Sequence, residues 1–358
     1  MKEPWGVELK SVEFDRFYGN AGVQAALADM IRNQRIPQTI LFSGPEGVGK
    51  ATLARRFAAR LLSDAHKIER DDLSLESNSS LITEREKWAP DKRNDDPLVF
   101  SSHPDFATFP PDGPLRQLTI PQMRLLKERA PLRPLHGPWK VFLIDGIDRA
   151  NEQAANSLLK TLEEPPSHLI LIMTARNAYD LLPTIRSRSV PFYFARLAEP
   201  EMREFLATRK DVDHAERRLH LAEGSPGLAV SLDLEAYDRR RTAMLALLNV
   251  ASGLEPFGTW IKHSDSIAAR RTEKMEAYLE SLYSLLEDIL RLAHGGPGAG
   301  NPVRNRDVQI ELAALARKVS FDWIRAAVAR VDELVDLARR NIQKSIAFDA
   351  LAVQLRSR

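Results

Sequence analysis

The run from Gly44 to Lys50, GPEGVGK, constrains the fold of this chain more than any other segment. It follows the apolar, strand-like residues 38–43 and precedes residues 51–62, where apolar side chains recur at helical spacing. In the order strand, glycine loop, helix, such a run turns backbone N–H groups toward phosphate oxygens, and the helix adds the positive end of its dipole. The sequence therefore predicts a phosphate-binding loop in an α/β sheet, in preference to a chance glycine turn.

The predicted nucleotide-binding residues are those of this loop, the two that follow it, and an aspartate at the end of a later strand: Gly44, Pro45, Glu46, Gly47, Val48, Gly49, Lys50, Ala51, Thr52 and Asp145. Lys50 would bring a positive charge to the phosphates. The Ser or Thr that normally holds Mg²⁺ after this lysine is replaced by Ala51, whose methyl group cannot bind a metal. The side chain of Thr52 points about 100° further around the helix. We therefore expect weakened metal binding, and nucleotide binding without tight Mg²⁺ stays open.

A second part of the usual hydrolytic site is also altered. Asp145 ends the apolar run KVFLID, at the place where P-loop ATPases carry a Mg²⁺-binding aspartate. The water-orienting glutamate that follows it in such ATPases is replaced by Gly146, and Asp148 is expected to cap the next helix. Thr174 follows the apolar run LILIM. Contact with a nucleotide and packing in the core are equal alternatives for its side chain. We expect negligible ATP hydrolysis by the chain alone.

Strand-like runs alternate with helical segments as far as residue 197, which predicts a parallel α/β sheet. Residues 63–102 interrupt this pattern with polar and charged side chains, and they are expected to form a partly disordered surface insertion. No strand is expected after residue 198. Residues 198–233 are predicted to form a small helical module and residues 234–358 a helical domain, with one long amphipathic face over 275–290.

Composition excludes several other kinds of protein. The chain has 358 residues, enough for two or three domains, and no cysteine, which excludes disulfides, thiolate catalysis and cysteine-bound zinc. Its eight histidines form no pair at a helical metal-binding spacing. The formal net charge of +2 lacks the strongly basic character of many DNA-binding proteins, so DNA contact should be local or delegated. The arginines at 239–241 are expected on a solvated helix face. No membrane span or export signal is apparent, and a cytoplasmic location is expected.

Four segments then occur in an informative order: HPDF at 103–106, TIPQMRLLKE at 119–128, the run at 140–166, and LLPTIRSRS at 181–189. Together they resemble the clamp-loader family of bacterial DNA polymerase III, and its delta-prime subunits in particular. The resemblance implies an AAA+ P-loop sheet domain at 1–197, a small helical lid at 198–233 and an all-α collar at 234–358. It also implies partners, namely gamma/tau and delta subunits in a hetero-pentamer, the sliding clamp, and primer–template DNA reached through the complex.

The resemblance also implies a role for Arg188. In the family a Ser-Arg-Cys motif sends an arginine into the ATP site of the neighbouring subunit, and here the motif is Ser187-Arg188-Ser189. The guanidinium is the group that stabilises charge on the transferring phosphoryl, so the loss of the cysteine is tolerable. The ordinary alternative is a surface arginine in a weak ion pair.

Two other family features are missing. The lid arginine that senses nucleotide is replaced by Gly227, and the four cysteines that often bind zinc in the family are absent. No metal and no required cofactor are therefore expected, whereas ATP or ADP bound without catalysis stays open.

Three functions are therefore weighed. The leading one is a delta-prime subunit that helps load the clamp without being an enzyme by itself. An active gamma/tau-type ATPase is opposed by Ala51, Gly146 and Gly227. A generic AAA+ adaptor would leave the LLKTLEEPP and IRSRS segments unexplained.

Overall fold

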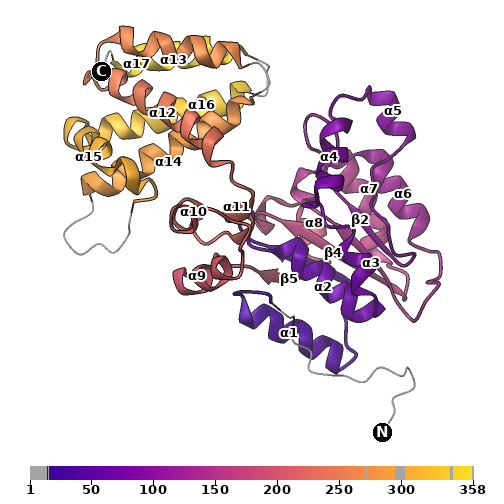
Figure 1. Ribbon diagram of the computed structural model, residues 1–358. Helices are drawn as coiled ribbons and strands as arrows, with labels where there is room; N and C mark the ends of the chain where they lie inside the picture. Colours follow the sequence, from indigo (N-terminus) through magenta and orange to yellow (C-terminus); the bar gives the residue numbers. More distant parts are fainter. Residues whose placement is uncertain (1–13, 15, 271–272, 295–302, 339–341, 357–358) are drawn as a thin grey trace. The chain divides into compact units, whose positions relative to one another are not determined.

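The computed structural model describes the whole chain except residues 1–13, 15, 271–272, 295–302, 339–341 and 357–358 (Figure 1). Its contacts divide the chain into two compact units. The first comprises residues 1–213 with 224–228, and the second comprises 214–223 with 229–358. The lid and collar boundaries expected after residues 197 and 233 stay predictions.

A five-stranded parallel sheet forms the centre of the first unit, in the order β2-β3-β4-β1-β5. The strands are β1 (Thr39–Ser43), β2 (Phe106–Phe109), β3 (Lys140–Ile144), β4 (Leu169–Ala175) and β5 (Val190–Tyr193). Every residue of β1 to β4 is buried, whereas β5 at the sheet edge is largely exposed. Strands covered on both faces need near-continuous apolar runs, which explains why the sequence reveals them. The predicted parallel α/β sheet is confirmed.

Helices cover both faces of this sheet. Helices α1 (Ala21–Arg32) and α2 (Lys50–Leu62) pack on one face, and α6 (Ile120–Arg129) and α7 (Glu152–Glu163) pack on the other. Asn151 caps α7 by accepting a hydrogen bond from the N–H of Ala154 at 2.8 Å. The remaining helical elements of this unit are η1 (Ile147–Arg149), η2 (Ala178–Asp180), α8 (Pro183–Arg186) and α9 (Glu199–Ala207).

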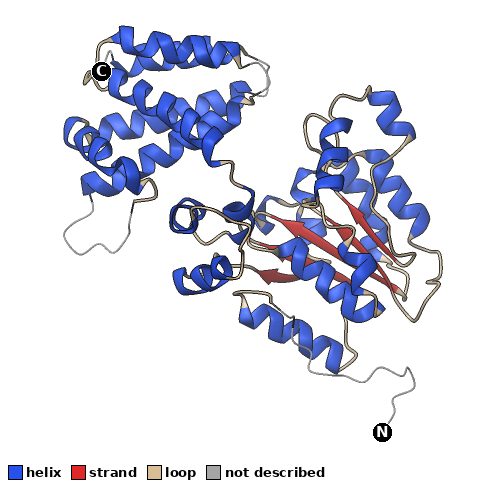
Figure 2. Cartoon of the chain, viewed as in Figure 1, coloured by secondary structure: helices blue, strands red, loops and turns tan. Residues whose placement is uncertain are grey.

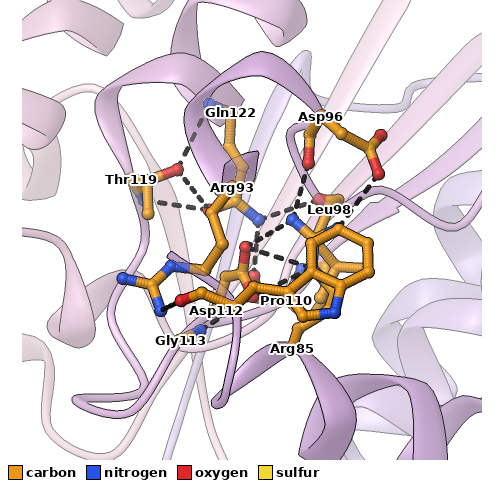
Figure 3. Close-up of polar contacts among 10 residues, drawn as sticks. Arg85, Arg93, Asp96, Leu98, Pro110, Asp112, Gly113, Thr119 and Gln122 are labelled. Carbon is orange, nitrogen blue, oxygen red and sulfur yellow. Dashed lines mark hydrogen bonds and ion pairs between the residues drawn. The ribbon is translucent and has the colours of Figure 1, made fainter. Parts of the chain in front are cut away.

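Residues 63–102 contain three short helices, which contradicts the prediction of a partly disordered insertion. They form α3 (Ala65–Glu69), α4 (Glu76–Arg85) and α5 (Pro90–Asp95). The Arg85 side chain is buried, and its Nη2 donates to Asp112 Oδ2 at 2.8 Å and to the carbonyl of Asp96 at 2.6 Å (Figure 3). Ile82 and Leu98 add buried apolar contacts. One buried ion pair and a few apolar side chains thus fix a segment whose overall composition is polar.

The second unit is entirely helical within the residues that the structure describes, as predicted (Figure 2). Its helices are α10 (Ala215–Ala222), α12 (Leu234–Ala251), α13 (Phe257–Ala269), α14 (Met275–His294), η3 (Arg306–Val308), α15 (Gln309–Lys318), α16 (Phe321–Ala338) and α17 (Lys344–Arg356); α11 (Pro226–Ser231) begins in the first unit and ends in the second. The predicted face over 275–290 is buried in this core. No described helix has the length and apolar content that a membrane crossing requires.

The arginines at 239–241 do not all lie on a solvated face. Arg241 is buried, and its Nη1 pairs with Asp307 Oδ1 at 2.6 Å. The expectation failed because the partner carboxylate comes from a distant turn, which no local pattern shows.

Candidate functional site

The glycine loop joins β1 to α2 at the carboxyl edge of the sheet, as predicted. A side chain at Gly44 would place its Cβ 2.3 Å from the Phe194 carbonyl oxygen, and one at Gly49 would meet the Phe17 ring at 2.9 Å. Within the described residues, the N–H groups of residues 46–49 donate no backbone hydrogen bond, and no side chain caps α2. The loop therefore keeps backbone donors at a helix N-terminus, which is what an anion requires.

Lys50 bends back over this loop. Its Nζ donates to the carbonyl oxygens of Gly44 at 2.6 Å and Pro45 at 2.7 Å. Burial lowers the pKa of the ammonium, and the nearby carboxylates of Asp145 and Glu46 partly oppose that shift. The lysine that would meet phosphate is thus held among loop carbonyls and acidic side chains.

Asp145 and Thr174 are brought together where β3 and β4 end. The hydroxyl of Thr174 donates to Asp145 Oδ1 at 2.6 Å and accepts from the N–H of Gly146 at 2.8 Å. Thr174 is also buried, so the structure joins core packing to a polar contact at the site. The predicted aspartate lies beside the loop, and one of its oxygens is already engaged by the threonine.

Asp148 does not cap the following helix, contrary to the prediction. It lies in the η1 turn, and its carboxylate accepts from Arg176 Nε at 2.9 Å. Asn151 caps this helix, as its place directly before the helical run NEQAANSLLKTLEE predicts. The partner of Asp148 follows β4, so the sequence around residue 148 gives no sign of it.

The two positions after Lys50 lie on the first turn of α2. Ala51 is half-buried and packs against the core on that face of the sheet, and Thr52 is also half-buried. Among the described residues no group of three or more His, Asp or Glu side chains is arranged to hold a metal ion. The expectation of weak Mg²⁺ binding depends on a different feature, the methyl group of Ala51, and stays a prediction.

Gly227 contacts the loop directly, which sequence reasoning did not reveal. Its N–H donates to the carbonyl oxygen of Gly47 at 2.8 Å. A Cβ at position 227 would lie 3.0 Å from both the Cα and the carbonyl oxygen of Gly47. The start of α11 can rest on the loop because neither residue has a side chain.

Arg188 follows α8 and is not part of this constellation. Its Nη2 donates to Glu163 Oε1 at 2.9 Å, and its Nη1 donates to the carbonyl of Thr184 at 3.0 Å. Arg188 is exposed. The structure thus gathers residues 44–52 with Asp145 into one site and places Arg188 in a separate surface ion pair. Glu163 was missed as its partner, although it lies within the LLKTLEEPP segment.

The parallel sheet, the glycine loop after β1 and the aspartate after β3 define an α/β P-loop protein. The profile of the family described as DNA polymerase III, delta subunit, matches residues 19–198. Since this match covers half of the chain, the protein belongs to that family.

Individual relatives agree with this assignment. The chain is 31% identical to the DNA polymerase III subunit delta-prime of Escherichia coli, over 64% of this chain and 66% of the relative. It is 26% identical to the E. coli subunit tau, over 84% of this chain and 47% of the relative. The chain therefore spans about two thirds of the length of the first relative and slightly less than half of the second. The expected resemblance to the clamp-loader family is confirmed.

Among solved structures, a DNA polymerase III gamma subunit-related protein from Thermotoga maritima shares 17% identity with this chain. The alignment covers 93% of this chain and 99% of that protein, with a TM-score of 0.42.

Proposed function

We propose that this chain is a delta-prime-type subunit of a DNA polymerase III clamp loader, which supports the ring without hydrolysing ATP itself. One observation carries the proposal: the cradle for phosphate is retained, but the three positions that would act on it lack functional groups. Ala51 offers only a methyl group, and Gly146 and Gly227 offer only hydrogen. Without a metal ligand and a water-orienting carboxylate, the site lacks the groups that stabilise phosphoryl transfer.

The proposal gives Arg188 its role in a neighbouring subunit. The guanidinium is exposed and its pair with Glu163 is at the surface, where such an ion pair contributes about 1 kcal/mol or less. Exchanging this partner for a phosphate in a neighbour's ATP site would therefore cost little. A trans arginine then stabilises the charge that develops on the transferring phosphoryl group.

The proposed partners are gamma/tau and delta subunits in a hetero-pentamer, the sliding clamp, and primer–template DNA contacted through the complex, in the cytoplasm. The loop would hold ATP or ADP for structural reasons and without catalysis, and the proposal includes no zinc. The net charge of +2 agrees with DNA contact shared among subunits.

A second candidate is an active gamma/tau-type ATPase subunit. The alignment to E. coli tau favours it, since that alignment covers 84% of this chain. Ala51, Gly146 and Gly227 count against it, because each removes a group that turnover uses.

Two measurements test the proposal. The purified chain should show no DNA-stimulated ATP hydrolysis above background; robust turnover that Lys50→Ala abolishes would establish the ATPase alternative instead. The chain should also complete a clamp-loading complex when mixed with the motor and delta subunits of its own organism.

The role of Arg188 is tested within that complex. Arg188→Ala should leave assembly intact and lower hydrolysis at the adjacent site by about 10³-fold. The matched control is Arg186→Ala, because Arg186 ends α8 two residues before Arg188 and its guanidinium lies over the Tyr179 ring. If Arg186→Ala lowered hydrolysis as much as Arg188→Ala does, the trans-arginine role proposed for Arg188 would be contradicted.

A further inference from the structure

A cavity of 280 Å³ opens at the amino ends of β2 and β3. Its walls come from Pro104 and Ala107 beside β2, Lys140 and Phe142 of β3, and the end of α6 with the loop that follows. Because the strands are parallel, this is the edge of the sheet opposite to the glycine loop. The cavity is therefore separate from the candidate nucleotide site.

Three cations line this cavity: Arg129, Arg133 and Lys140. In the part of the chain that the structure describes, none of their side chains forms a hydrogen bond or an ion pair, and no acidic residue lines the walls. Lys140 is only 6% exposed, and burial lowers the pKa of its ammonium. Arg129 is half-buried and Arg133 is exposed, so the cavity presents three positive charges at different depths. A lining with cations and no carboxylate is electrostatically complementary to an anion.

Asp105 is the carboxylate that acts on Lys140, but the two side chains form no ion pair. Asp105 attracts Lys140 electrostatically, but its two oxygens accept the N–H groups of Leu135 and His136, each at 2.7 Å. These bonds tie the loop after α6 to the start of β2. Asp105 therefore holds in place the loop that carries Leu135 at the cavity wall.

The mouth of the cavity is apolar. Leu132 is 57% exposed and Leu135 is 74% exposed, and both line it. Phe142, the only aromatic residue of the described lining, is buried. A nucleic-acid strand would be expected to meet exposed aromatic rings for base stacking, whereas exposed leucines next to cations suit apolar and acidic side chains together.

We propose that this cavity docks an acidic and apolar segment of a partner protein, with carboxylates at Arg129, Arg133 and Lys140 and an apolar side chain against Leu132 and Leu135. The guanidinium groups can bind a carboxylate through two hydrogen bonds, and Lys140 adds a point charge from the floor. This inference does not depend on the proposed function.

The test uses the full-length chain and a fluorescein-labelled peptide that carries adjacent aspartates beside a phenylalanine. Fluorescence polarisation should show saturable binding. Replacing the aspartates by asparagine, or the phenylalanine by serine, should weaken binding about tenfold or more. Arg133→Gln and Lys140→Met should do the same. Arg124→Gln is the control, because Arg124 is exposed on α6, the helix that contributes Arg129, and lies outside the cavity.

Arg133 is exposed, so Arg133→Gln remains informative even if the buried Lys140 proves necessary for folding. Equal binding by wild type, Arg133→Gln and Arg124→Gln would overturn the proposal. Complete competition by inorganic phosphate at equal concentration, or tighter binding of a labelled single-stranded oligonucleotide lost in Arg133→Gln, would overturn it as well. Loss of peptide binding in the cavity variants alone would support it.

Discussion

The N–H of Gly227 donates to the carbonyl oxygen of Gly47 at 2.8 Å, so the start of α11 is bonded to the middle of the glycine loop. Both residues belong to the first compact unit. Position 227 is where the clamp-loader resemblance places a nucleotide-sensing arginine. The glycine there does more than remove a guanidinium, because it lets the backbone approach the loop where any side chain would crowd it.

Gly227→Ala should therefore destabilise the chain. The added Cβ would stand 3.0 Å from the Gly47 Cα, and crowding of this kind costs about 1–3 kcal/mol. Urea unfolding gives the free energy. Gly22→Ala is the control, since a Cβ at Gly22 in α1 meets nothing within 4 Å and should stabilise the helix by up to about 1 kcal/mol. Equal effects of the two substitutions would contradict the packing argument.

Thr174→Val should cost about 1–3 kcal/mol of unfolding free energy, because it leaves Asp145 Oδ1 and the Gly146 N–H without their shared hydroxyl. Valine has nearly the same shape, so the loss reports the hydrogen bonds and not the packing. Thr174→Ser retains the hydroxyl and should recover those hydrogen bonds at the cost of one methyl group. If valine were tolerated as well as serine, the hydroxyl would have no structural role.

Arg85→Met should destabilise the chain by about 3–5 kcal/mol, because it leaves the buried Asp112 carboxylate unpaired. Arg85→Met combined with Asp112→Asn should recover part of this loss. Limited proteolysis should show cleavage within residues 63–102 in the single variant. The exposed Arg70, replaced by Met, serves as the control and should change stability by less than about 0.5 kcal/mol. If Arg85→Met neither lowers the stability nor exposes residues 63–102 to proteolysis, Arg85 does not hold this segment in place.

Asp71 should make stability fall as pH rises. Burial raises the pKa of its carboxyl, although the N–H of Ser102 and the nearby Arg55 and His103 partly oppose the shift. The folded chain then holds the proton more tightly than the unfolded chain. The free energy of unfolding therefore falls as pH rises from the ordinary pKa of the carboxyl to its raised pKa in the folded chain. The stability of Asp71→Asn relative to wild type should therefore increase across that window and level off above it, as measured by urea unfolding at several pH values.

Asp64→Asn provides a contrast of opposite sign. The N–H of Lys67 lowers the pKa of the Asp64 carboxyl, so this residue stabilises the fold above its ordinary pKa and the stabilisation is lost as pH falls. The free energy of unfolding of the wild type should therefore increase relative to that of Asp64→Asn as pH rises. Two variants with the same slope would show that the pH dependence has another origin.

Much of the fold was readable in the sequence because its causes are local. The apolar runs of β1, β3 and β4 are buried on both faces, and Asn151 stands where a helix needs a cap. The prediction for residues 63–102 failed because composition averages over a segment. A buried arginine counts as polar in that average, although Arg85 is among the largest fully buried side chains of the chain.

The sequence by itself determined the glycine loop, the parallel sheet, the helical second half and the family, because spacing and glycine positions are properties of neighbouring residues. Only the tertiary structure decided what those residues contact. It placed Gly227 on Gly47, Thr174 on Asp145, and Glu163 beside Arg188. It also left three cations around one cavity without ion-pair partners among the described residues. Such contacts join residues that are far apart in the chain, and they form only when the strands, helices and loops pack together.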